Sequence, residues 1–230
     1  MLRTPAPIAL LGGTFDPVHY GHLRFADDVR RALGLPEVRL VPAGDPPHRE
    51  GPAASAAERL AMLKLAVVEF PGLIVDEREL RRAGKSYTVL TLEELRREFP
   101  GRPLLLLLGA DAFRGLPMWH RWREIFDLAH VVVVERPGID LEAGMPAPLL
   151  PIWRERLTDD VRALRERPAG SILIQPIAPV DASATAIRDQ LAQRRAAGGA
   201  WRGLLPPAVL AYIDLHHLYG RKEPVPKDAP

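Results

Sequence analysis

Five consecutive leucines, Leu104–Leu108, stand between Pro103 and Gly109. A strand that is apolar at every position has no polar face, so both of its faces must be covered, as in the parallel sheets of α/β proteins. Further short apolar runs are Ile8–Leu11, Val38–Val41, Leu73–Val75, Val131–Val134 and Ile172–Ile174. The leucine run therefore predicts a buried parallel sheet with helices on both faces.

Segments with helical periodicity separate these apolar runs. Between Gly21 and Leu33, the apolar residues Phe25, Val29 and Leu33 recur every four positions. Ser55 and Glu58 have the spacing of a capping box. Further helices are expected over Leu60–Val68, Thr88–Phe99, Trp153–Arg165 and Ala184–Arg195, and from Pro206 onward. The alternation of strand and helix predicts an α/β, Rossmann-like parallel sheet with right-handed crossovers.

The length of 230 residues fits one α/β domain. We expect this single domain over residues 1–220, with a proline-rich insertion at about 137–170 and a small C-terminal helical part at about 184–220. Residues 221–230 are rich in proline and charge, so they are expected to be disordered.

Composition excludes several classes of protein. The chain has no cysteine, which excludes disulfides, thiolate metal sites and a cysteine nucleophile. A net charge of +2 gives little long-range field, so no nucleic-acid partner is expected. Apolar runs are too short for a membrane span or a signal peptide. The sequence thus predicts a soluble cytoplasmic protein without a membrane partner, and a homo-oligomer is compatible with it.

The segment Gly12–His22, with the sequence GGTFDPVHYGH, directly follows the first predicted strand. Ligands of open α/β sheets bind beyond the carboxyl ends of the strands. Gly12 and Gly13 let an anion approach the backbone N–H groups, Thr14 adds a hydroxyl, and the following helix points its positive end to the same place. His19 and His22 would face this pocket. The segment predicts a phosphate site.

Three other interpretations of the glycines and histidines fit less well. The G-x-G-x-x-G pattern of dinucleotide-binding proteins is absent, and Gly84-Lys85-Ser86 cannot end a Walker loop because Glu79 occupies the position of its first glycine. Zinc binding by His19 and His22 lacks a third ligand nearby and the i, i+4 spacing of helical zinc sites. A purely structural role for the two histidines remains an alternative.

A second phosphate-binding pattern lies late in the chain. Ser183 is placed to cap a helix, Thr185 lies in its first turn, and Arg188 lies near the end of that turn. A guanidinium beside a helix N-terminus suits an anion. Two such helix ends suit a triphosphate better than a monophosphate, although Ser183 could simply cap its helix.

Read together, these motifs resemble the H-x-G-H nucleotidyltransferases, and among them the nicotinate mononucleotide adenylyltransferases. The matching segments, in family order, are GGTFDPVHYGH (12–22), VPAGDPPH (41–48), GKSYT (84–88) with Thr91-Leu92, GAD (109–111), Trp119, RPG (136–138) and SATAIR (183–188). The terminal helix, with Tyr212 and Tyr219, also resembles the family. Three positions depart from its pattern: Arg49 replaces a lysine, and Ala182 and Ala184 replace an isoleucine and a serine.

The resemblance implies adenylyl transfer from ATP to nicotinate mononucleotide, giving deamido-NAD and pyrophosphate. It implies Mg²⁺ bound to the phosphates and to water, with no protein ligands. The implied catalytic residues are His19, His22 and Arg188. The implied ATP-binding residues are Gly12, Gly13, Thr14, Phe15, Gly109, Asp111, Ser183 and Thr185. The implied residues for nicotinate mononucleotide are Asp16, His48, Arg49, Tyr87, Thr88, Trp119 and Arg136.

Trp119 and Trp122 are expected on one short helix, where Trp119 would stack on the pyridine ring and Trp122 would join the core.

Two other functions remain alternatives. A related enzyme such as pantetheine-phosphate adenylyltransferase would lack the Ser86–Thr88 and Trp119 elements. A non-catalytic nucleotide sensor on the same fold would not need His19, His22 and Arg188 together.

Overall fold

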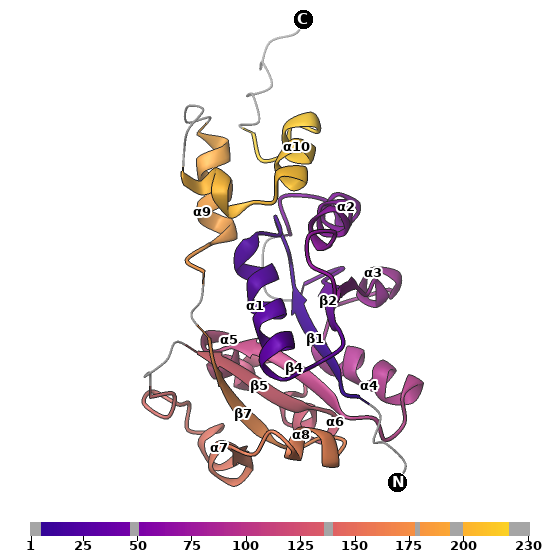
Figure 1. Cartoon of the computed structure of the whole chain (residues 1–230), viewed down its shortest axis with the longest axis vertical. Helices are drawn as coiled ribbons and strands as arrows, with labels where there is room; N and C mark the ends of the chain where they lie inside the picture. The colour runs from indigo at the N-terminus through magenta and orange to yellow at the C-terminus, as the bar shows by residue number, and fades with distance from the viewer. Residues whose placement is uncertain (1–5, 47–50, 136–139, 178–179, 194–199, 221–230) are drawn as a thin grey trace, which may run out of the picture.

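The computed structural model describes residues 6–46, 51–135, 140–177, 180–193 and 200–220. Over these residues the strands form one parallel sheet in the order β3-β2-β1-β4-β5-β7-β6 (Figure 1). The strands are β1 (Ile8–Gly13), β2 (Val38–Pro42), β3 (Leu73–Val75), β4 (Leu104–Gly109), β5 (His130–Glu135), β6 (Leu157–Thr158) and β7 (Ile172–Pro176). The predicted Rossmann-like parallel sheet is confirmed.

The leucine strand β4 occupies the middle of this sheet, between β1 and β5. Because successive side chains of a strand point to opposite faces, its leucines feed two separate cores. Leu105 and Leu107 join the core that holds Val29 of helix α1 (Tyr20–Ala32). Leu104, Leu106 and Leu108 join the core that holds Leu92 of helix α4 (Thr88–Glu98). Burial of β4 on both faces explains why it has no polar position.

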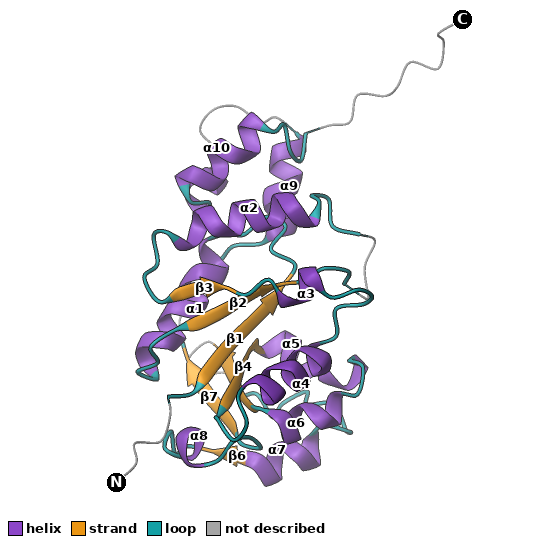
Figure 2. Ribbon diagram, turned by 90° about the vertical axis from the view of Figure 1, so that its right-hand side faces the viewer, coloured by secondary structure: helices purple, strands orange, loops and turns teal. Residues whose placement is uncertain are grey.

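Helices cover both faces of the sheet (Figure 2). The α-helices are α1 (Tyr20–Ala32), α2 (Ala56–Val67), α3 (Arg78–Arg81), α4 (Thr88–Glu98), α5 (Ala110–Arg114), α6 (Ile125–Leu128), α7 (Leu150–Arg156), α8 (Ala163–Glu166), α9 (Ala184–Ala192) and α10 (Pro207–Leu215). The 3₁₀ helices are η1 (Leu116–Met118), η2 (Trp122–Glu124) and η3 (Ala200–Leu204). None of the helices in the described ranges is long and apolar enough to cross a membrane.

The helix signals read from the sequence are largely confirmed. The Ser55 hydroxyl accepts from the N–H of Glu58, and the Glu58 carboxylate accepts from the N–H of Ser55 at 2.7 Å, so the capping box starts α2. Helices α9 and α10 form the expected C-terminal helical part at one end of the molecule, next to α2 (Figures 1 and 2). The expected disordered tail, 221–230, lies outside the described residues.

The single helix expected over Trp153–Arg165 is wrong. Helix α7 ends at Arg156, and Leu157 and Thr158 extend as β6 to pair with Ile172 and Leu173 of β7. The Thr158 hydroxyl then accepts from the N–H of Asp160 at 3.1 Å, which offers the backbone an alternative to a helical turn. This part of the insertion adds an edge strand to the sheet.

Candidate active site

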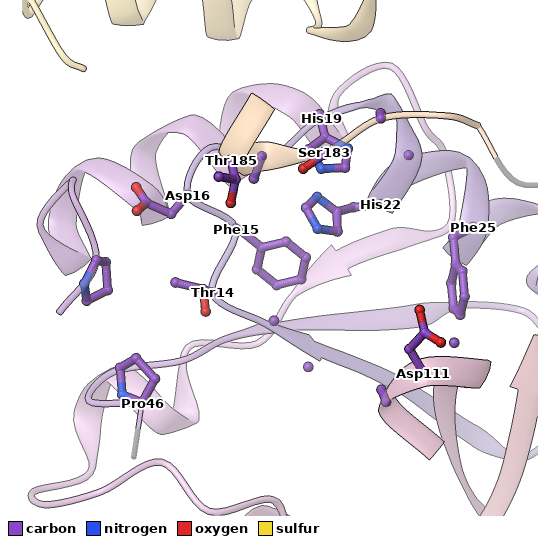
Figure 3. A pocket seen from close by; sticks show the side chains of 18 of the residues that line it. Thr14, Phe15, Asp16, His19, His22, Phe25, Pro46, Asp111, Ser183 and Thr185 are labelled. Carbon is purple, nitrogen blue, oxygen red and sulfur yellow. The ribbon is translucent and has the colours of Figure 1, made fainter. Parts of the chain in front are cut away.

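A large pocket opens at the carboxyl ends of β1, β4 and β5 (Figure 3). It has a volume of about 1480 Å³, larger than the roughly 300–1,000 Å³ of a typical small-molecule site. Its lining includes Gly12, Gly13, Thr14, Phe15, Asp16, His19, His22, Ser86, Tyr87, Thr88, Gly109, Asp111, Trp119, Glu135, Ser183, Thr185 and Arg188. The structure thus brings the predicted site residues that it describes into one cavity, which has room for two nucleotides.

His19 and His22 lie at the start of α1, where His19 is the N-cap residue. Their rings stack with centroids 3.8 Å apart and an angle of 23° between the planes. The ring of Phe15 meets that of His22 edge to face at 5.1 Å. A Cβ on Gly21 would lie 2.8 Å from the His19 ring, so a larger residue there would displace the ring. Glycine at this position of the H-x-G-H motif leaves room for the stacked histidines.

Both imidazoles favour the neutral form in this structure. Burial lowers the pKa of His19 to about 4. Burial also lowers the pKa of His22 well below its ordinary value, and the nearby His19 lowers it further. Neither Nδ1 atom has a hydrogen-bond partner within the described part of the chain. Two buried, unpartnered imidazoles beside a helix N-terminus are suited to a ligand that brings negative charge.

The Asp16 carboxylate accepts hydrogen bonds from two other parts of the chain, and the residue is only 5% exposed. Its Oδ2 accepts from the N–H of Ala53 at 2.7 Å, and its Oδ1 accepts from the N–H of Ala54 at 3.1 Å. The hydroxyl of Tyr219 also donates to Oδ1, at 2.7 Å. The carboxylate therefore joins the β1 loop, the approach to α2 and the C-terminal segment. A direct contact between Asp16 and a substrate stays a prediction.

Arg188 reaches the site from α9. One of its guanidinium nitrogens donates to the backbone carbonyl of Asp16 at 2.6 Å, and the other donates to the Thr185 hydroxyl at 3.3 Å. Ser183 accepts from the N–H of Ala186 at 3.4 Å, so it caps α9 as expected. The contact with Asp16 places the guanidinium beside the β1 loop, although 172 positions separate the two residues.

Arg59, which sequence analysis missed, supports the site from the core without lining the pocket. It is 1% exposed, and its guanidinium donates to the carbonyls of Thr14 at 2.7 Å and of Gly44 at 3.4 Å. It thereby fixes the loops that follow β1 and β2. The feature of the sequence that could have pointed to it is an arginine on the buried face of α2, next to apolar residues.

The other end of the pocket is aromatic. The rings of Tyr87 and His120 lie 4.3 Å apart, and Trp119 lines the cavity beside them. Tyr87 is the N-cap residue of α4 but provides no side-chain cap, and Thr88 is the first residue of that helix. The backbone donors at the start of α4 are thus not used by a capping side chain.

The expectation that Trp119 and Trp122 share one helix is wrong. Trp119 follows η1, Trp122 begins η2, and Arg121 between them adopts a left-handed conformation with φ of 51°. The reversal turns Trp119 toward the pocket, whereas Trp122 is buried in the core as predicted.

At the carboxyl end of β4, Gly109 caps α5 and Asp111 projects into solvent at the rim of the pocket. Three further predicted site residues, His48, Arg49 and Arg136, lie outside the described residues. Over the residues that the structure describes, no group of three or more His, Asp or Glu side chains could hold a metal ion.

Comparison with known proteins agrees with this geometry. A model of the cytidylyltransferase-like family matches residues 10–190. A probable nicotinate-nucleotide adenylyltransferase of Halorhodospira halophila is 52% identical over 208 residues, which cover 90% of this chain and 91% of that protein. The chain belongs to the nicotinate-nucleotide adenylyltransferase family.

A second family member, from Aeromonas salmonicida, is 48% identical over 93% of this chain and 97% of its own. Among solved structures, the nicotinic acid mononucleotide adenylyltransferase of Plasmodium falciparum complexed with NaAD is similar, with a TM-score of 0.69. The match covers 94% of this chain and 98% of that one at 15% identity, so it supports the fold. Family membership also accounts for the order of the motifs along the sequence.

Proposed function

We propose that this chain transfers the adenylyl group of ATP to nicotinate mononucleotide, giving deamido-NAD and pyrophosphate. One observation carries the proposal: a single pocket is lined by both sets of predicted residues. His19, His22 and Arg188 lie at one end of it, and Thr88 and Trp119 lie at the other. The first end has the chemistry of a phosphate site, and the second has that of a site for an aromatic acid.

The reaction needs little proton transfer. A phosphate oxygen of the mononucleotide attacks the α-phosphorus of ATP, the bond from that phosphorus to the bridging oxygen breaks, and pyrophosphate leaves. The second pKa of a phosphomonoester is about 6, so the nucleophile is already ionised near neutral pH and no general base is required. Catalysis then rests on positioning and on stabilising the charge that develops at the α-phosphate.

Four side chains and two helix ends would supply that stabilisation. His22 and Arg188 would donate to oxygens of the α- and β-phosphates, and His19 and Thr185 would hold the rest of the phosphate chain. The N-termini of α1 and α9 add partial positive charge at the same place. Because burial keeps both imidazoles neutral beforehand, the phosphates would restore the protonated form in which they donate twice.

We further infer that Mg²⁺ accompanies ATP, bound by phosphate oxygens and water. Mg²⁺ keeps several waters when it binds, which suits an ion that is carried on substrate phosphates. When bound, the ion would neutralise charge on the phosphates. The experiment is dialysis against a chelator, followed by an assay with and without added Mg²⁺.

At the other end, the start of α4 would receive the carboxylate of the pyridine ring. The uncapped N–H groups and the Thr88 hydroxyl are donors, which match a group that only accepts. Trp119 would stack on the ring. The neutral amide analogue would present an NH₂ group to donors and find no acceptor, so the acid is the better substrate.

The test is pyrophosphate release on mixing the protein with ATP and nicotinate mononucleotide, with the dinucleotide product identified by mass. Parallel reactions contain the amide mononucleotide or phosphopantetheine in place of the acid. We expect rapid turnover with the acid. Product only with phosphopantetheine would support the related enzyme, and ATP binding without any product would support the nucleotide sensor.

A further inference from the structure

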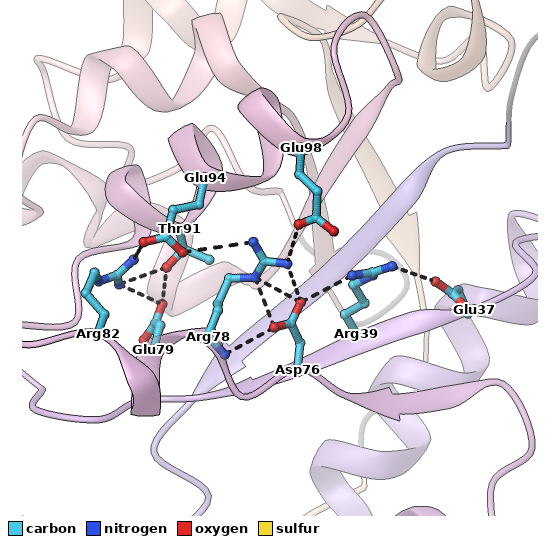
Figure 4. Close-up of polar contacts among 9 residues, drawn as sticks. All are labelled: Glu37, Arg39, Asp76, Arg78, Glu79, Arg82, Thr91, Glu94 and Glu98. Carbon is cyan, nitrogen blue, oxygen red and sulfur yellow. Dashed lines mark hydrogen bonds and ion pairs between the residues drawn. The ribbon is translucent and has the colours of Figure 1, made fainter.

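A buried carboxylate lies behind the wall of the pocket that carries Tyr87 and Thr88. Glu79 belongs to the short helix α3 and is 8% exposed. It accepts a hydrogen bond from the Thr91 hydroxyl at 2.5 Å and lies 3.9 Å from the Arg82 guanidinium (Figure 4). Burial raises the pKa of this carboxyl group, and the nearby side chains of Thr91, Arg82 and Ser86 oppose that shift. No role in the proposed reaction accounts for this group.

Ser86 shows what Glu79 controls. The Ser86 hydroxyl oxygen accepts from the N–H of Gly44 at 2.9 Å and from the N–H of Asp45 at 3.3 Å. These two bonds use both lone pairs of the hydroxyl and leave its proton available to the neighbouring carboxylate of Glu79. Ser86 thus joins the loop after β2 to the loop before α4, beside Glu79.

Thr91 is held in a similar way on the other side. Its hydroxyl accepts from Arg82 at 3.1 Å and donates to Glu79, while Arg82 also pairs with Glu94 of α4 at 2.7 Å. Ser86 precedes Tyr87 and Thr88, and Thr91 follows them within the first turn of α4. The carboxylate therefore holds the first turn of α4 directly through Thr91 and lies beside Ser86 at the other end of the segment that faces the pocket.

We propose that Glu79 is a positioning residue for the recognition of the substrate carboxylate: through Ser86 and Thr91 it fixes the start of α4, so that the donors of Tyr87 and Thr88 face the pocket. The proposal rests on the proposed function. Glu79 touches no substrate and acts through the residues that it holds. It sets substrate preference and leaves the phosphate end of the pocket unaffected.

The charge at this position favours a carboxylate. The Thr91 hydroxyl donates to Glu79 Oε1 at 2.5 Å, and the Arg82 guanidinium lies 3.9 Å from the same oxygen. Glutamine has nearly the same shape but no charge, and one of its two terminal groups is an NH₂ donor. Glu79→Gln therefore removes the negative charge beside Arg82 and weakens the hydrogen bond from Thr91.

The experiment compares Glu79→Gln with Glu98→Gln. Glu98 is a matched control because it is also a glutamate of this charged cluster, but it pairs with Arg78 at 3.1 Å and is the last residue of α4, far along the helix from Thr88 (Figure 4). For each variant, kcat and KM are measured with the acid mononucleotide, the amide mononucleotide and ATP. Glu79→Gln is expected to raise the KM for the acid about tenfold and to reduce the acid-over-amide preference, because the start of α4 is no longer held in place. The KM for ATP should stay within about twofold, and Glu98→Gln should change none of the three.

The variant Ser86→Ala and the double variant test whether Glu79 acts through Ser86. If it does, the two effects on the acid KM are not additive. If circular dichroism shows that Glu79→Gln does not fold, Ser86→Ala alone provides the test. It is expected to raise the KM for the acid mononucleotide without a similar rise for ATP. An unchanged acid KM in folded variants, or equal losses for ATP and both mononucleotides, would overturn the positioning role. A wild type that makes no dinucleotide would instead contradict the proposed function, and this role with it.

Discussion

The hydroxyl of Tyr219 donates to Oδ1 of Asp16 at 2.7 Å, joining residues that are 203 positions apart in the chain. Burial raises the pKa of Tyr219, and the hydrogen bond to Asp16 raises it further, so the phenol keeps its proton and acts as a donor. Asp16 at the same time holds the N–H groups of Ala53 and Ala54 and, through its carbonyl, Arg188. The C-terminal segment is therefore attached directly to the loop that carries the histidines.

Tyr219→Phe removes this hydroxyl and little else. Because a hydrogen bond to a charged group contributes about 1.5–3 kcal/mol, the free energy of unfolding should fall by about that amount in urea titrations. Tyr212→Phe, which changes a tyrosine of the same C-terminal segment that stacks on His216, is the control and should cost less. Equal stability of wild type and Tyr219→Phe would contradict a structural role for the bond.

Gly21→Ala tests the packing of the two histidines. The added Cβ would lie 2.8 Å from the His19 ring, which must then move. Since a displacement of about 1 Å at a reacting centre can cost roughly 10²-fold, kcat should fall by about that factor. Gly203→Ala, at a glycine with open space around it, is the control. Steady-state kinetics at saturating ATP provide the measurement.

His22→Ala tests charge stabilisation at the α-phosphate. Loss of one such donor should lower kcat by roughly 10²–10³ with a much smaller change in ATP affinity. Arg188→Lys should retain only part of the activity, because a point charge cannot make the two contacts of the guanidinium. Turnover of His22→Ala within about threefold of wild type would rule out this role.

The pKa of His19 predicts a pH dependence of stability without substrates. The folded-state pKa is about 4, below the 6.5 of an ordinary histidine, so the unfolded state binds more protons between these values. The contribution of the neutral imidazole is complete above pH 6.5 and is lost as the pH falls toward 4. Urea unfolding at several pH values should show a weaker pH dependence for His19→Gln than for wild type. Parallel curves would contradict the lowered pKa.

Variants of Thr88 and Trp119 should differ in their effect on the preference for the acid over the amide. An unpaired NH₂ group costs about 1–3 kcal/mol, so wild type should prefer the acid to the amide by roughly ten- to a hundredfold in kcat/KM. Thr88→Ala removes one donor and should reduce that ratio. Trp119→Ala should weaken both substrates alike, because stacking does not distinguish them. Equal use of acid and amide by wild type would show that the start of α4 is misassigned.

The sequence predicted correctly those elements whose structure depends mainly on residues that are close together in the chain. The leucine strand, the Ser55 capping box and the Ser183 cap depend on neighbouring residues, and all three are confirmed. Family resemblance predicted which distant segments share the pocket. Both approaches failed where a long-range partner overrides local preference, as at Leu157, which pairs with β7 instead of continuing a helix. Arg59 was missed because its partners are backbone carbonyls of other loops.

The bond between Asp16 and Tyr219 also has a consequence for synthesis. At about 5–20 residues per second, the ribosome adds these two residues on the order of 10–40 s apart. During that interval the nascent chain can pair β1 with β2 and bury the histidines, but it has neither Arg188 nor the phenol that holds Asp16. A nascent chain shorter than 188 residues therefore lacks the guanidinium that contacts the β1 loop, and one shorter than 219 residues lacks the bond that attaches the C-terminal segment to that loop.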